Sequence, residues 1–281
     1  MDNQEDFFAK PEFTVGGALR RGFYALFKKP SVFIGLPLFV LLLDAAIQLY
    51  LFYRFFGFGR EIDEVFASGY LGRDVMVFSF IWRIVEFLLW LMVMGAITFA
   101  VYNVLRIGKV SFGKSLGRGL ARFLPLLGLT ILLGIAAFLL AMLLGYMLEV
   151  SGRTMQIIIL CALLVVLVIL ACILFVSVPA CVVEKKGVFG CLARSAELTK
   201  GNRLSIFFIG LIAMLLTVIL RFICQFILVM LTRDFVVITL VSTIIISIPI
   251  GFFHVLTATV YYDLRAAKEG VTLDSLASVF D

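Results

Sequence analysis

Residues 155–183 read MQIIILCALLVVLVILACILFVSVPACVV, a run in which no residue is charged. A helix that crosses the hydrocarbon core of a bilayer needs about 20 consecutive, mostly apolar residues, and this run is long enough. Five further runs also qualify, so the predicted spans are 31–53, 75–102, 123–147, 155–183, 204–231 and 235–262. The sequence therefore predicts an all-α integral membrane protein with six transmembrane helices.

The composition of the 281 residues excludes the other broad classes of protein. Hydrophobic residues make up 63% of the chain and charged residues 15%, whereas soluble domains have about 45–50% and about 25%. The chain opens with acidic side chains and its first apolar run begins only at Ser31, which argues against a cleavable signal peptide. Five cysteines without a CxxC spacing argue against a disulfide framework or a zinc site.

Lysine and arginine are distributed unevenly between the connections. Of the 24 basic residues, 17 lie before the first span, in 106–122, in 185–203 or after the last span, and five lie in the other three connections. Basic residues near span ends stay on the cytoplasmic side, so we expect both termini to be cytoplasmic and the membrane to be a bacterial or archaeal plasma membrane. The net charge of +6 then predicts contact with anionic lipid headgroups rather than with nucleic acid.

A nine-residue motif recurs before each pair of spans. TVGGALRRG (14–22) and SFGKSLGRG (111–119) share four identical positions, and GVFGCLARS (187–195) keeps the Leu-x-Arg core. The corresponding residues are Leu19, Leu116 and Leu192, and Arg21, Arg118 and Arg194. Each copy predicts a short amphipathic helix that lies in the membrane interface before a helical hairpin.

The motif divides the chain into three hairpin repeats within one membrane domain. We expect an N-terminal tail over 1–13, repeats over 14–105, 106–183 and 184–262, and a C-terminal tail over 263–281. Each repeat begins on the cytoplasmic side, crosses outward and returns. The arrangement predicts a pseudo-threefold axis near the membrane normal, unlike the inverted repeats of many transporters.

Two segments resemble the membrane domain of glycerophosphoryl diester phosphodiesterase-like proteins. They are PACVVEKKGVFGCLARSAELTKGNR (179–203) and YYDLRAAKEG (261–270), the latter followed by Leu273 and Leu276. The resemblance implies a stand-alone six-span relative without the catalytic domain, because hydrolysis in that family belongs to a separate soluble barrel. Here only about 20 residues follow the last span and His254 is the sole histidine, so the activity cannot be carried over and we expect no cofactor or metal.

Four ionisable side chains fall inside predicted spans, in the outer half of the bilayer. They are Asp44, Arg83, Glu86 and Arg221, and their formal charges sum to zero. Such residues are rare and mark functional sites by default. They can line an outward-opening cavity for a charged or zwitterionic ligand such as a lipid headgroup, or they can form ion pairs that fix the helices.

His254 is a weaker candidate, three positions after Gly251 and five after Pro249 in the sixth predicted span. A kinked helix that carries an imidazole can take part in a proton pathway. The alternative is an interhelical hydrogen bond, because no carboxylate lies at helical spacing.

The sequence contains no HExxH, GxSxG or P-loop motif, so an enzyme is the least supported class. Two functions remain. The first is a non-enzymatic accessory subunit, scaffold or assembly partner that holds another membrane protein. The second is a transporter, channel or lipid-handling protein that uses the intramembrane charges.

Overall fold

A computed structural model describes residues 13–56, 73–107, 112–150, 152–184, 186–232 and 234–270, and within these ranges the chain is helical without strands. The helices are α2 (Val15–Lys28), α3 (Pro30–Phe33), α4 (Gly35–Phe56), α6 (Arg73–Ile107), α7 (Phe112–Ala121), α8 (Phe123–Val150), α9 (Arg153–Leu174), α10 (Ser177–Val183), α11 (Val188–Thr199), α12 (Arg203–Leu231) and α13 (Phe235–Glu269). Six helical segments of the described residues are long and apolar enough to cross a membrane: Pro30–Arg54, Met76–Leu105, Phe123–Val150, Arg153–Val183, Arg203–Leu231 and Phe235–Glu269. The prediction of six spans is therefore confirmed.

Two predicted spans are each built from two helices. The break between α3 and α4 lies before Pro37, and the break between α9 and α10 lies before Pro179. Proline has no amide hydrogen, so these residues cannot donate to the carbonyls of Phe33 and Phe175, four positions earlier. By contrast, α13 continues from Phe235 to Glu269 through Pro249.

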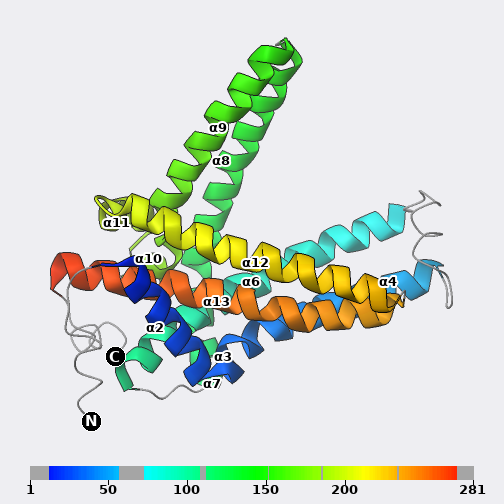
Figure 1. Ribbon diagram of the computed structural model, residues 1–281, viewed down its shortest axis with the longest axis horizontal. Coiled ribbons are helices and arrows are strands. Elements are labelled where there is room, and N and C mark those ends of the chain that lie inside the picture. Colours follow the sequence, from blue (N-terminus) through cyan, green and yellow to red (C-terminus); the bar gives the residue numbers. More distant parts are fainter. Residues whose placement is uncertain are drawn as a thin grey trace.

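Helix α13 is the centre of the packing. It contacts α2, α4, α6 and α12, and the four long helices α4, α6, α12 and α13 run together in Figure 1. The half of α13 that is cytoplasmic in the predicted orientation carries most of the fully buried side chains of this helix. Among them are Val255, Leu256, Val260, Tyr261 and Leu264, each 0% exposed.

The hairpin of α8 and α9 is arranged differently from the other two. It projects away from the four long helices, and its tip contacts none of them in Figure 1. Over the most apolar window of each segment, only 11% of the Phe123–Val150 span and 6% of the Arg153–Val183 span are buried inside the protein, against 44% for Met76–Leu105. The hairpin therefore presents almost all of its apolar surface to its surroundings.

The three short helices form at the positions that the motif predicts. Two of them, α7 and α11, each pack against the span just before them in the chain, and α2 packs against the last span. Helix α2 contacts α13, α7 contacts α6, and α11 contacts α9 and α10. The last position of each motif copy is small and meets that span. A Cβ at Gly22 would touch Leu256, a Cβ at Gly119 would overlap the backbone of Met92, and the Ser195 hydroxyl donates to the Ile173 carbonyl at 2.7 Å.

Candidate functional site

Asp44 is the centre of an intramembrane hydrogen-bond network between α4 and α6. Its carboxylate accepts from the Trp82 indole at 2.9 Å and from the Gln48 amide, and it pairs with the Arg83 guanidinium at 3.3 Å. Asp44 is 8% exposed. A buried carboxylate has to be paired and hydrogen-bonded to offset its desolvation, and these three donors satisfy that requirement.

Glu86 extends the network along α6. It pairs with Arg83 one turn earlier and accepts a long hydrogen bond of 3.4 Å from the Trp90 indole. The ring of Trp90 lies against that of His254 on α13, with centroids 5.7 Å apart. Within the described residues the His254 imidazole has aromatic neighbours and makes no hydrogen bond, so the interhelical hydrogen bond that we considered does not form there.

Arg221 does not join this network. Among the residues that the structure describes, its guanidinium forms no ion pair, and its side chain is exposed. A charged side chain near the bilayer centre costs about 2.5–3.5 kcal/mol on insertion scales. Of the four predicted residues, the structure thus brings Asp44, Arg83 and Glu86 together and leaves Arg221 apart, so its position calls for a separate explanation.

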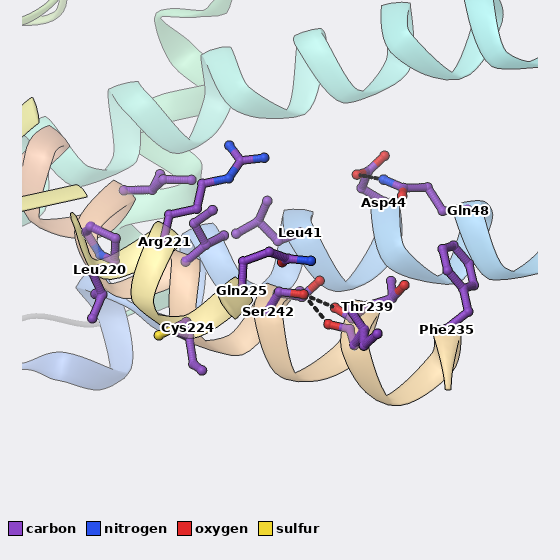
Figure 2. Close-up of a pocket in the computed structure, with 16 residues that line it drawn as sticks. Leu41, Asp44, Gln48, Leu220, Arg221, Cys224, Gln225, Phe235, Thr239 and Ser242 are labelled. Atoms are coloured by element: carbon purple, nitrogen blue, oxygen red, sulfur yellow. Dashed lines mark hydrogen bonds between the residues drawn. The ribbon is translucent and has the colours of Figure 1, made fainter. Parts of the chain in front are cut away.

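A pocket of about 430 Å³ lies between α4, α12 and α13. Asp44 and Arg221 are its charged lining residues, while Arg83 and Glu86 lie outside it, which corrects the prediction that all four line one cavity. Its other polar residues include Gln48 from α4, Gln225 from α12 and Thr239 from α13. Figure 2 shows Asp44 and Gln48 at one end of this pocket and Arg221 toward the other.

A second polar cluster joins α11 to the C-terminal end of α13. Arg194 pairs with Glu184 at 2.7 Å, with Glu197 at 2.9 Å and with Glu269. Tyr261 donates to Glu184 at 3.0 Å. The side chains of Arg194 and Glu184 are only 10% and 7% exposed, so the ion pair at the centre of this cluster is buried. We call the cluster the clasp.

The charges of the clasp stabilise one another. Burial alone would raise the pKa of Glu184, but hydrogen bonds from Arg194 and Lys186 outweigh it and hold the pKa below the usual range. Burial likewise acts to lower the pKa of Arg194, and its carboxylate partners raise it by more. Both groups are therefore charged at neutral pH, and the clasp is an ion pair rather than a neutral hydrogen bond.

The other two motif arginines also reach the preceding span. Arg21 on α2 pairs with Asp263 on α13 at 2.8 Å, and both side chains are largely buried. The Arg118 guanidinium lies 5.6 Å from the centroid of the Phe99 ring on α6, in a cation–π contact. Our prediction placed these arginines at lipid headgroups, whereas Arg21 and Arg194 form ion pairs with carboxylates within the chain.

Two kinds of site residue were not predicted from the sequence. Trp82 and Trp90, the only two tryptophans, escaped because hydropathy counts tryptophan as apolar although its indole is a donor. Asp263 escaped because it stands past the predicted sixth span. The ends of the second and sixth spans do share a sequence pattern, because T-x-x-V-Y-x-x-L-R occurs at 98–106 and again at 257–265. Asp263 lies within the second copy of this pattern.

In the described part of the chain, no three or more His, Cys, Asp or Glu side chains gather where they could hold a metal ion. Residues 13–264 match the family described as a domain of unknown function (DUF7847). No curated protein and no solved structure matches the chain. The resemblance to the membrane domain of glycerophosphoryl diester phosphodiesterase-like proteins stays a prediction.

Proposed function

We propose that this chain, which belongs to the DUF7847 family, is a non-enzymatic integral membrane protein that holds a partner protein within the bilayer through the hairpin of α8 and α9. The observation that carries the proposal is a seam of small residues on α8 that the described part of the chain leaves exposed. Ala137, Ala141 and Gly145 recur every four residues, and all three are exposed.

The glycines of this chain divide into two groups. Gly95, Gly119 and Gly251 sit where a Cβ would press on the backbone of a neighbouring helix, so their size is explained by packing within the chain. A Cβ at Gly134 or Gly145 on the hairpin would meet nothing within 4 Å. Small residues at four-residue spacing allow the backbones of two membrane helices to approach closely, whereas lipid chains need no such seam. The unused seam therefore supports an apolar transmembrane helix of another protein as the partner.

The test replaces two seam residues in the full-length protein and compares purified complexes. The double variant A141L/G145L should lose a stoichiometric partner that co-purifies with the wild type in mild detergent. The matched control L143F enlarges an exposed residue on the opposite face of α8 and should keep it. A photo-crosslinking residue at position 141, but not at position 143, should join the chain to that same partner. Retention of the partner by A141L/G145L would refute the proposal, as would a wild-type protein that purifies alone or only with second copies of itself.

The proposal includes the orientation and the threefold repeat. Both termini and the three short helices face the cytoplasm, and exposed basic residues of these helices, such as Lys114, lie toward anionic headgroups. The support for the orientation is the asymmetry of lysine and arginine. The support for the repeat is the cyclic packing of α2, α7 and α11 against the preceding spans, together with the pattern shared by 98–106 and 257–265.

The proposal also includes the resemblance to glycerophosphoryl diester phosphodiesterase-like membrane domains, and contacts within the chain support it. The two segments that carry it, 179–203 and 261–270, contact one another. Lys268 donates to the carbonyls of Glu197 and Lys200, each at 2.7 Å, and Glu269 pairs with Arg194. The two segments that carry the resemblance thus meet where α11 packs against the end of α13.

A further inference from the structure

We propose that the pocket between α4, α12 and α13 binds the phosphate group of a membrane amphiphile, with Arg221 as the cation that pairs with it. This site is independent of the hairpin surface proposed above, since the pocket has no lining residue from α8 or α9. Either proposal can fail without the other.

Of the two charged residues that line the pocket, Asp44 has ion-pair and hydrogen-bond partners and Arg221 does not, among the described residues. Asp44 is already satisfied by Arg83, Trp82 and Gln48, so its carboxylate has no need of a positive ligand. Arg221 has no such partner among the described residues and is the other charged residue that lines the pocket. A cation within a membrane span that has no counter-ion among the described residues favours an anion from outside the chain.

Unused hydrogen-bond donors accompany Arg221. Gln225 follows it by one helical turn on α12 and so lies on the same face. On the facing helix α13, Thr239 and Thr243 are also one turn apart and line the same pocket. Within the described residues neither hydroxyl makes a hydrogen bond, and neither does the Gln225 amide.

Several other membrane-embedded hydroxyls of this protein are already hydrogen-bonded. Those of Thr98, Thr130, Thr217 and Thr259 donate to carbonyls one turn earlier on their own helices. Ser242, between the two pocket threonines, also donates back to the Ile238 carbonyl, as Figure 2 shows. Polar groups in hydrocarbon have to be satisfied without bulk water. The residues that carry a guanidinium, an amide and two hydroxyls line one pocket, and such donors match the several acceptor oxygens of a phosphate.

The remaining lining makes an amphiphile a better fit than a free ion. Apolar side chains form the other walls, among them Leu41, Leu220, Ile246 and Ile250. Helix α12 has 29 residues and is about 44 Å long, so it extends about 7 Å beyond each boundary of a hydrocarbon core of about 30 Å. Arg221 is ten residues, or about 15 Å, from the end of α12, which places its Cα about 8 Å inside that boundary. The long side chain can extend toward the headgroup level from there, where a lipid presents its phosphate.

The experiment uses the purified, delipidated full-length protein and measures bound lipid by native mass spectrometry. Phosphatidylglycerol should bind, and diacylglycerol with the same acyl chains should bind at least tenfold more weakly because it lacks the phosphate. R221Q should weaken phosphatidylglycerol binding at least tenfold. The matched control R203Q removes an exposed arginine from the same helix outside the pocket and should leave binding unchanged. If R221Q fails to fold, T239V removes one hydroxyl at nearly constant shape and should weaken binding several-fold.

Four results would overturn the proposal. R221Q, or T239V in its place, could bind phosphatidylglycerol as the wild type does. R203Q could lose as much binding as R221Q, which would indicate general attraction to headgroups. Diacylglycerol could bind as tightly as phosphatidylglycerol. Finally, inorganic phosphate at millimolar concentration could displace the lipid completely, which would identify a free anion as the ligand.

Discussion

Two glycines of helix α7 should respond in opposite directions to the same substitution. At Gly119 a Cβ would lie 2.5 Å from the Met92 carbonyl oxygen and 2.8 Å from the Ala96 amide nitrogen, where ordinary Cβ contacts are at least 3.4 Å. Both neighbours are backbone atoms of α6 and cannot rotate away, so α7 would have to move. At Gly117, two positions earlier on the same helix, a Cβ would meet nothing within 4 Å.

The contact distances set the expected magnitudes. Overpacking that shifts the backbone costs about 1–3 kcal/mol, and the absence of a flexible neighbour places G119A near the upper end. Alanine gains about 1 kcal/mol over glycine in a helix interior, so the net loss is about 2 kcal/mol. One kcal/mol corresponds to about 2–4 °C in Tm for a chain of this size range. G119A should therefore lower the Tm by about 4–8 °C, and G117A should raise it by about 2–4 °C.

Buried thiols supply the assay. Cys181 and Cys191 are both 0% exposed, so a thiol-reactive fluorogenic dye reports their exposure as the protein is heated in detergent. The exposed Cys161 and the partly exposed Cys224 are first replaced by alanine to remove the background. Equal Tm values for G119A and G117A would show that the approach of α7 to α6 is wrong.

Further substitutions test the clasp, the intramembrane network and the orientation. Because the folded-state pKa of Glu184 is lowered, its pair with Arg194 stabilises the fold above the ordinary carboxyl pKa of about 4.3 and is lost as pH falls through the lower folded value. Lowering the pH from 6 to 3 should thus reduce the Tm of the wild type more than that of E184Q, and equal losses would contradict the clasp. W82F removes a donor to a carboxylate and should cost about 1.5–3 kcal/mol, measured by the same dye assay; an unchanged Tm would exclude that hydrogen bond. A cysteine placed at Asp234 should react with an impermeant maleimide on intact cells, and reaction only after lysis would invert the orientation.

Hydropathy predicted the spans well because their length depends on the thickness of the bilayer rather than on contacts within the chain. It could not predict the interruption before Pro179, since the run stays apolar on both sides of the break. It also could not predict that α8 and α9 stand apart. Their spans have a mean hydropathy of 2.7 and 3.7, against 2.2 to 2.7 for the packed spans, but hydropathy does not say whether an apolar surface meets lipid or a neighbouring helix.

The polar residues were predictable as a set but not as contacts. Asp44, Arg83 and Glu86 could be grouped by depth, and the structure joins them. Arg221 has the same depth, but whether it reaches Asp44 depends on the rotation of α12 about its axis, which one sequence does not encode in an obvious way. Arg21 and Arg194 fit a headgroup role by spacing alone, and only tertiary packing reveals their carboxylate partners.

The contact between α2 and α13 bears on the order of the elements along the chain. The Arg21–Asp263 pair brings the first described helix against the last, so residues more than 200 positions apart form one packed junction. A circular permutant, in which a linker joins the ends of the chain and new termini fall between α6 and α7, would keep α2 beside α13. Normal folding of that permutant would show that this junction forms whatever the order in which its two helices are synthesised.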